Sequence, residues 1–283
     1  MGKFDGCLLA CDIDGTLTAN GVIPDDNVKA IEHFAKEGGL FSIATGRSIV
    51  AFYDVLEKIP DVSLCVVFNG AVIYDYKEDR IVYEETLPDA DKYIIKEVLS
   101  LGKNIGIEIH SGKKVYTVFE TKETIDHHTH ENLERNLASF DDVSDEVWNK
   151  VLFTVDNEDE LKFLVDSVSK FNLQSSLVET STYIDGKKRL YYEIIPFGID
   201  KGKGLEKLKE ILKVKKGCTF AIGDYYNDLE MIKKADIGAA VEASPDDIKQ
   251  FADYVAVECE KGAVADFINF LEKRKDAENG QSN

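Results

Sequence analysis

Two aspartates, Asp12 and Asp14, lie at the end of the first apolar run of the chain, just before Gly15. The run from Cys7 to Ile13 predicts a buried strand, and a glycine after it permits a sharp turn. Ligands of open α/β sheets bind at the carboxyl ends of the strands. The two carboxylates therefore suggest a metal site or an acid–base pair, although an Asp-Gly turn that merely closes the strand has the same sequence.

Three more segments place a hydroxyl group, a lysine and two further aspartates where predicted strands end or helices begin. The segments are Ile43-Ala44-Thr45-Gly46-Arg47, Gly198-Ile199-Asp200-Lys201-Gly202 and Gly223-Asp224-Tyr225-Tyr226-Asn227-Asp228. Each has an ordinary alternative, because threonine and aspartate cap helices and a lysine at a helix start is usually solvated. Taken alone, each segment therefore has both a functional and an ordinary structural interpretation.

Apolar, β-branched runs alternate with amphipathic segments over the first and last parts of the chain. This pattern predicts an α/β fold with a doubly wound, mostly parallel, Rossmann-like sheet. Strands are predicted at Cys7–Ile13, Leu40–Thr45, Ser63–Asn69, Leu190–Pro196 and Cys218–Gly223. Helices are predicted at Pro24–Lys36, Ser48–Lys58, Lys201–Leu212 and Tyr226–Lys234, with short elements at Ile237–Val241, Asp246–Phe251 and Ala263–Lys273. The polar tail, residues 274–283, is expected to fray.

The middle of the chain has a different pattern. Helix candidates at Asp89–Leu101, Thr121–Asn136 and Asn157–Phe171 are mixed with strand candidates at Ile105–His110, Lys114–Phe119, Val151–Val155 and Leu173–Thr180. An α+β domain inserted between the two halves of an α/β domain explains both patterns. We therefore expect a catalytic core of residues 1–84 and 189–283 and an inserted cap of residues 85–188.

The four polar segments occur in the order found in the haloacid dehalogenase superfamily of phosphatases. Asp12-Ile13-Asp14-Gly15-Thr16-Leu17 is similar to its first motif, and the other three segments resemble the second, third and fourth. The long insert between the second and third motifs, together with Phe68-Asn69-Gly70-Ala71, resembles the Cof-like branch, which has a subclass IIB cap. The resemblance covers nearly the whole chain, although the cap contributes almost none of it.

The resemblance implies a Mg²⁺-dependent phosphohydrolase that forms a covalent aspartyl-phosphate on Asp12. Asp14 would be the general acid and base, and Lys201 would neutralise Asp12 and the transferring phosphoryl group. The metal ligands would be the Asp12 side chain, the Asp14 backbone carbonyl and the Asp224 side chain. Asp228 would support the metal from behind these ligands.

Contacts with phosphate or substrate are implied for Thr45, Gly46, Arg47 and Asn227. The Thr45 hydroxyl and nearby backbone amides would hold phosphate oxygens. Arg47 and Asn227 match family positions near the phosphate or the substrate, and either could instead hold a loop. The substrate would be a sugar phosphate or a related small metabolite, selected by a mobile cap whose closure excludes water.

Glu242 departs from the family pattern. It follows Gly238-Ala239-Ala240-Val241, at a position where family members often have an asparagine near the active site. A carboxylate there would repel a phosphate or bind a substrate hydroxyl, and the sequence supports both interpretations.

Histidines of the predicted cap suggest two further sites. His127 and His130, with His128 between them, share a face of a predicted helix and suggest a metal site, but a solvated polar helix is the better interpretation. His110 is a candidate substrate contact, because it ends a predicted strand and leads into a loop at Ser111-Gly112.

Composition limits the partners of the chain. The 34 basic and 53 acidic residues give a net charge of −19, and such a surface repels nucleic acid and anionic membranes. No apolar run reaches the roughly 18–20 residues of a membrane-spanning helix, and the first residues lack the features of a signal peptide. We expect a cytoplasmic monomer or weak homo-oligomer that binds a small phosphorylated metabolite. The five cysteines lack C-x-x-C spacing, which argues against disulfides and a zinc site.

Two other functions fit part of the pattern. A phosphomutase would need a cap rich in arginine to bind a second phosphate, but the predicted cap has Arg135 and little else before Arg189. A non-catalytic regulator that binds phosphorylated metabolites would not need the full set of catalytic residues. Turnover of a simple aryl phosphate with Mg²⁺ present distinguishes that regulator from an enzyme.

Overall fold

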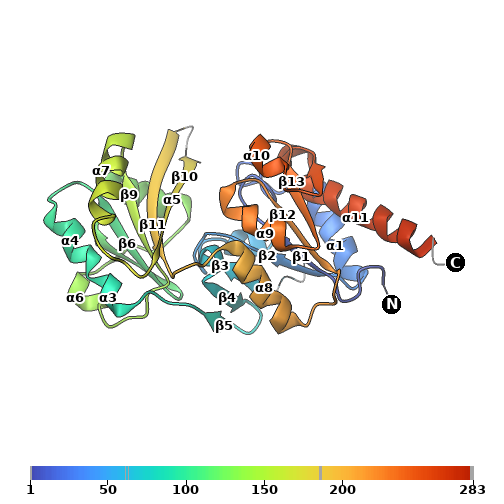
Figure 1. The fold of residues 1–283 in the computed structure, drawn as a ribbon, viewed down its shortest axis with the longest axis horizontal. Helices are drawn as coiled ribbons and strands as arrows, with labels where there is room; N and C mark the ends of the chain where they lie inside the picture. Colours follow the sequence, from blue (N-terminus) through green and yellow to red (C-terminus); the bar gives the residue numbers. More distant parts are fainter. Residues whose placement is uncertain (1, 61, 63, 185–186, 281–283) are drawn as a thin grey trace. The chain divides into compact units, whose positions relative to one another are not determined.

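The computed structural model describes residues 2–60, 62, 64–184 and 187–280, which form two compact units. The core unit comprises residues 1–46, 53–82 and 200–283, and the cap unit comprises residues 47–52 and 83–199 (Figure 1). The units differ from the predicted division in two places. A short segment after Gly46 groups with the cap, and the cap extends to Ile199 rather than to residue 188.

The core is built on a five-stranded parallel sheet. Its order is β14 (Tyr254–Ala256), β13 (Ile237–Val241), β12 (Thr219–Gly223), β1 (Leu8–Cys11) and β2 (Leu40–Ile43). Every residue of β1, β12 and β13 is buried, as expected for a parallel sheet that is covered on both faces. The chain leaves β1 toward β2 and leaves β12 toward β13, so right-handed crossovers place their connecting helices on opposite faces.

Two helix pairs cover this sheet. Helix α1 (Asp25–Lys36) packs against α11 (Ala263–Gly280), and α8 (Lys201–Leu212) packs against α9 (Leu229–Lys234) (Figure 1). The shorter α10 (Asp246–Lys249) follows β13. Among the helices of the described residues, none combines the length and the apolar character that crossing a bilayer requires.

Helix α11 continues through most of the segment that was expected to fray, so that expectation was wrong. It extends to Gly280, and residues 281–283 lie outside the described residues. The Lys3 ammonium group holds this part of the helix, because Nζ donates to Glu272 Oε1 at 2.8 Å and to Asp276 Oδ2 at 3.0 Å. Contacts between the two ends of the chain are not visible in a local sequence pattern.

A smaller antiparallel sheet consists of β3 (Leu64–Val67), β4 (Val72–Asp75) and β5 (Arg80–Glu84). An isolated bridge between Ala44 and Val66 joins β3 to the end of β2. The predicted strand began at Ser63, which lies outside the described residues.

The helix predicted at Ser48–Lys58 is reduced to α2 (Tyr53–Leu56). Ahead of it, Ala51 N donates to Ser48 O, which closes a turn rather than a helix.

The cap contains a six-stranded sheet in the order β10-β11-β9-β6-β7-β8. These strands are β10 (Ser176–Ile184), β11 (Lys187–Ile195), β9 (Lys150–Val155), β6 (Gly106–Ser111), β7 (Lys114–Phe119) and β8 (Asn136–Leu137). One face is packed with apolar side chains from the helices α4 (Ile94–Ser100), α6 (Phe140–Val143) and α7 (Glu158–Val168). The short helix α3 (Asp89–Lys92) precedes α4. Helix α5 (Lys122–His130) contacts β6 and β9.

Strand β11 explains the larger difference in the domain boundary. The run Leu190–Pro196 was assigned to the core, but β11 pairs antiparallel with both β10 and β9 of the cap. An apolar run shows that a strand is buried without showing which sheet it joins. Helix α5 is also shorter than predicted, since Glu131 caps it and Asn132 adopts a positive φ of 51°.

We expect Gly204→Ala to destabilise the core, although alanine is more favourable than glycine in a helix by about 1 kcal/mol. A Cβ at this position of α8 would lie 2.4 Å from Val66 Cγ1 and 2.9 Å from Gly70 Cα. Overpacking of this kind typically costs about 1–3 kcal/mol, so urea unfolding should show a net loss of up to about 2 kcal/mol. Lys203→Ala, at an exposed position of the same helix, is the control and should lose no stability. Equal stability of the two variants would contradict the close packing of α8.

Candidate active site

The predicted site residues of the core meet at the carboxyl ends of β1 and β12. These strands are adjacent and parallel, with Cys11 opposite Ile222. Asp12 follows β1 and Asp224 follows β12, at the point where the chain turns toward opposite edges of the sheet. Carboxylate oxygens of Asp12, Asp224 and Asp228 lie within 4.8 Å of one another.

Lys201 lies between two of these carboxylates. Its Nζ donates to Asp12 Oδ1 and to Asp228 Oδ1, both at 2.6 Å. Asp200 caps α8 by accepting from Lys203 N, which fixes the first turn that carries the buried ammonium group. Burial alone would lower the pKa of Lys201, but the charges of Asp12 and Asp228 raise it above its ordinary value. The lysine therefore stays cationic.

Asp228 is fully buried and fixes the turn after β12. Its Oδ2 accepts hydrogen bonds from Asp224 N at 3.0 Å and from Tyr225 N at 3.2 Å. Gly223 permits this approach, since a Cβ there would lie 2.4 Å from Asp228 Cβ. The expected role of Asp228 behind the metal ligands stays a prediction.

The carboxylate cluster has the chemistry of a site for a hard divalent cation. Burial, followed by the charge of Asp228, raises the pKa of Asp12 well above its usual range. The same two causes raise the pKa of Asp224 to about 6, against the hydrogen bond that Thr16 Oγ1 donates to it at 3.0 Å. A cation would relieve this repulsion, and an all-oxygen donor set suits Mg²⁺. Gly15 keeps the space open, because a Cβ there would lie 2.6 Å from Asp224 Oδ2.

Asp14 lies in a different environment from Asp12. Asp12 is only 6% exposed, whereas Asp14 is exposed in the turn that follows it. Gly15 N donates to Thr18 O at 3.0 Å, which closes this turn. Two neighbouring carboxylates with unlike surroundings can serve different chemical roles.

Asn69 joins the phosphate-binding residues predicted after β2 to those predicted after β12. Thr45 is buried, and its carbonyl accepts from Asn69 N at 3.0 Å. A Cβ on Gly46 would lie 2.8 Å from Asn69 Oδ1, and the same oxygen accepts from Asn227 Nδ2 at 3.4 Å. The structure thus brings Thr45, Gly46 and Asn227 into one loop cluster.

Two residues of this site were given no role on sequence grounds. Thr16 was noted only as part of the first motif, and Asn69 only as part of a segment typical of the branch. Asn69 has a φ of 54°, a left-handed conformation that asparagine tolerates better than most residues. The available signal was an Asn-Gly pair at the end of a predicted strand, which is common in ordinary turns.

Arg47 and His110 belong to the cap unit. Arg47 Nη1 donates to Ala51 O at 3.0 Å within the segment that groups with the cap. His110 was expected to lead into a loop, but it lies inside β6, paired with Val115, and is fully buried. Burial lowers the pKa of His110 to about 4, so the imidazole is neutral although Glu108 Oε2 lies 3.5 Å away.

The interpretation of α5 as a solvated helix was wrong. His127 and His128 are buried, and only His130 of the three is exposed. His127 Nδ1 lies 2.9 Å from Glu108 Oε2, and His128 Nε2 lies 3.4 Å from Glu108 Oε1. The buried carboxylate of Glu108 on β6 explains the burial of these two histidines, because both lie close enough to interact with it. Within the described residues, the core carboxylates form the one group with metal-ligand spacing, and these histidines do not.

Glu242 is exposed at the end of β13, the strand next to β12. It therefore lies at the same edge of the sheet as Asp224.

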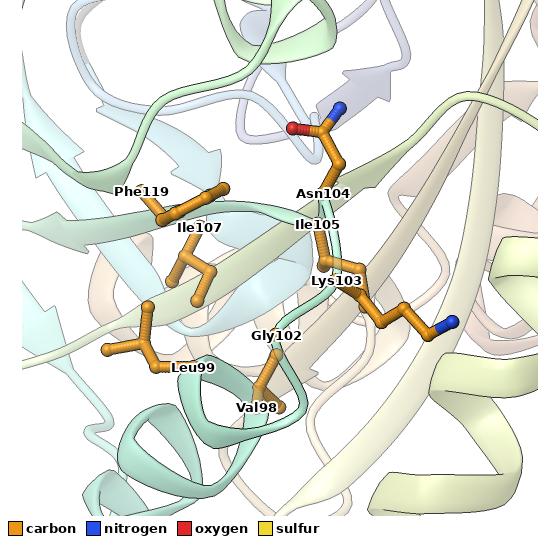
Figure 2. Close-up of a pocket in the computed structure, with 8 residues that line it drawn as sticks. All are labelled: Val98, Leu99, Gly102, Lys103, Asn104, Ile105, Ile107 and Phe119. Carbon is orange, nitrogen blue, oxygen red and sulfur yellow. The ribbon is translucent and has the colours of Figure 1, made fainter.

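Figure 2 shows a pocket of the cap that is unrelated to these residues. Its lining comes from α4, β6, β7 and the loop between α4 and β6: Val98, Leu99, Gly102, Lys103, Asn104, Ile105, Ile107 and Phe119. This mostly apolar lining includes no nucleophile, no acid–base pair and none of the predicted site residues. The pocket is therefore not a candidate active site.

Comparison with known proteins agrees with this geometry. A family model for haloacid dehalogenase-like hydrolases matches residues 9–268. A 5-amino-6-(5-phospho-D-ribitylamino)uracil phosphatase of Bacillus subtilis is 28% identical over 249 residues, which cover 88% of each chain. A solved structure from Thermotoga maritima has a TM-score of 0.80 at 24% identity and covers 93% of this chain and 96% of its own. A subclass IIB sugar phosphatase has a TM-score of 0.77 at 19% identity, with 94% and 99% covered.

These findings confirm the predicted fold, a parallel α/β core with an additional sheet that forms a cap. They also confirm the predicted enzyme class, a phosphatase. The chain belongs to the haloacid dehalogenase-like hydrolase family.

Proposed function

We propose that this enzyme hydrolyses small phosphate monoesters, sugar phosphates among them, with Asp12 as the nucleophile and Mg²⁺ as the cofactor. The observation that carries the proposal is the buried Asp12 carboxylate, which accepts from Lys201 Nζ at 2.6 Å beside Asp224 and Asp228. A phosphate monoester repels a carboxylate nucleophile unless cations lie beside both groups. Lys201 supplies one such cation, and the carboxylate cluster fits a second.

The Asp12 side chain, the Asp14 backbone carbonyl and the Asp224 side chain would hold Mg²⁺, with Asp228 supporting them from behind. When bound, the ion would neutralise charge on the phosphoryl oxygens and on the surrounding carboxylates.

The side chains themselves would divide the reaction into two steps. Asp12 attacks phosphorus and the ester oxygen leaves, so that a phosphoryl group is bonded to the Asp12 carboxylate. Asp14, exposed next to it, gives a proton to the leaving oxygen and then takes one from the water that attacks phosphorus. The Thr45 hydroxyl and the Gly46 amide bind phosphoryl oxygens, while Asn69 positions this loop beside Asn227.

Relatives support a hydroxyl-rich leaving group. One is named for a substrate with a phosphoribityl group, and a structural neighbour is described as a sugar phosphatase. Arg135, the cap arginine considered for binding the second phosphate of a phosphomutase substrate, donates from Nη2 to Glu120 Oε1 at 2.7 Å. Because this arginine is already paired with a carboxylate, it does not favour the phosphomutase alternative.

Asp12→Asn should abolish turnover and leave the fold intact, because it removes the nucleophile while keeping the shape of the side chain. We expect kcat for an aryl phosphate to fall by roughly 10³-fold or more, with an unchanged circular dichroism spectrum. Asp25→Asn, at an exposed position of α1, is the matched control and should retain full activity. Retention of more than a few per cent of kcat by Asp12→Asn would rule out the covalent route.

Asp14→Asn should slow chemistry without removing the metal, since the proposed ligand there is the backbone carbonyl. Losing a general acid and base typically costs about 10²–10⁴-fold in kcat, most for an ester with a poor leaving group. Kinetics with a sugar phosphate and an aryl phosphate, together with calorimetric titration of Mg²⁺, measure both effects. A normal rate with the poor leaving group would exclude Asp14 from this role.

Removal of Mg²⁺ with EDTA should abolish activity, and added Mg²⁺ should restore it. Calcium should not substitute, because it prefers about 6–8 ligands at longer distances and can bind both oxygens of Asp12. Steady-state rates across a panel of metals make this measurement. Full activity in EDTA or in calcium alone would contradict the proposed metal site.

A further inference from the structure

One face of the cap sheet carries a buried polar cluster that the proposed phosphoryl chemistry does not use. Its side chains on the strands are Glu108 and His110 from β6, Lys150 from β9, and Tyr191 and Glu193 from β11. Alternate residues of a strand face opposite sides, so their neighbours Ile109 and Tyr192 belong to the apolar core on the other face. The alternation of side chains along each strand therefore places the polar cluster on one face of the sheet and the apolar core on the other.

Helix α5 adds His127 and its capping residue Glu131 to this face. His127 Nδ1 lies 2.9 Å from Glu108 Oε2, and Nε2 lies 3.5 Å from Glu131 Oε2. Burial alone would lower the pKa of His127, but the two carboxylates raise it to about 10. Burial alone would raise the pKa of Glu131, but His127 lowers it to about 2. An imidazolium thus holds an ionised carboxylate at the edge of the cluster.

Two further cations complete the charge balance. Lys150 Nζ lies 3.1 Å from Glu193 Oε1, and both side chains are buried. The charge of Arg47 also acts on Glu131. Counting His127, these three cations match the three carboxylates Glu108, Glu131 and Glu193. Arg189, whose charge also acts on Tyr191, is paired with Asp126, so the cluster offers no surplus positive charge to an anionic ligand.

The hydroxyl of Tyr191 stands apart from this balanced network. Tyr191 is 7% exposed, and its Oη is buried without a hydrogen-bond partner among the described residues. Its ring packs edge-on against His127 with centroids 5.3 Å apart, and Glu131 and Glu108 are the carboxylates that act most strongly on its hydroxyl. A buried hydroxyl without a partner destabilises the protein, so it calls for a specific explanation.

We propose that Tyr191 Oη and the Glu131 carboxylate recognise an uncharged, hydroxyl-bearing leaving group, the sugar or polyol part of a phosphate monoester. A substrate hydroxyl can donate to the carboxylate while another accepts from the tyrosine. The inference rests on the proposed phosphatase function and names the part of the substrate that the cap binds.

Two observations connect this cluster to the substrate. The Glu131 side chain is 14% exposed, so the edge of the cluster lies at the protein surface. Arg47, whose charge reaches Glu131, directly follows Thr45 and Gly46 of the predicted phosphate-binding loop in the sequence. A leaving group with a second phosphate would find every cation of the cluster already matched by a carboxylate.

Tyr191→Phe tests the proposal, because it removes only the hydroxyl oxygen. The variant should unfold at the same temperature as the wild type or higher, since an unpaired buried group is lost. With a sugar monophosphate, kcat/KM should fall by about 2- to 12-fold, mainly through KM, while an aryl phosphate should stay within about twofold. Calorimetry should show binding of the sugar monophosphate weakened by the same factor.

Tyr192→Phe is the matched control, because it removes a hydroxyl from the next residue on the apolar face. It should leave both substrates and the binding of the sugar monophosphate unchanged. A destabilised Tyr191→Phe with equal losses on both substrates would assign the hydroxyl to a structural water and overturn the proposal. Unchanged kinetics and binding would overturn it as well. A wild type that binds the sugar phosphate and turns over no phosphate ester would instead defeat the proposed function.

Discussion

The ammonium group of Lys201 lies between the carboxylates of Asp12 and Asp228, 2.6 Å from each, and the rest of the core site is arranged around it. Buried carboxylates that face one another need a cation or a shared proton between them. Each end of the arrangement is fixed separately: Asp200 caps the helix that carries the lysine, and Asp228 accepts from two backbone amides after β12. The order of the sheet supplies the remaining condition, since it makes β1 and β12 neighbours.

The cap also buries carboxylates beside a cation, but its ratio of cations to carboxylates differs from that of the core. In the cap, His127 lies between the carboxylates of Glu108 and Glu131 as Lys201 does between those of the core. The core cluster keeps more carboxylates than cations, and burial together with the remaining repulsion from Asp228 raises the pKa of Asp224 to about 6. Such a surplus suits a divalent ion and, with it, a phosphate. The cap cluster is balanced, which suits a neutral polar group and leaves the Tyr191 hydroxyl to select it.

Local patterns were sufficient for the elements of the core. The helix predicted at Lys201–Leu212 has the observed bounds, because an aspartate cap and an apolar stripe mark it within one segment. The carboxylates of the first and fourth motifs were expected to meet, and they do. Partners distant in sequence were not predictable: the pairing of β11 with cap strands and the link from Asn69 to Asn227 depend on which strands become neighbours. The burial of His127 and His128 could not be predicted from the pattern of their own helix, because their buried partner, Glu108, lies on a different element.

The central claim, that Asp12 carries the phosphoryl group, has one direct measurement. Rapid acid quench during the first turnover with an aryl phosphate, followed by proteolysis and mass spectrometry, locates any phosphorylated residue. Asp14→Asn slows the second step and so favours accumulation of the intermediate. The account predicts a phosphoryl adduct on the peptide that contains Asp12. The adduct should disappear once the substrate is exhausted. Turnover with no adduct on that peptide, or with an adduct on another residue, would contradict it.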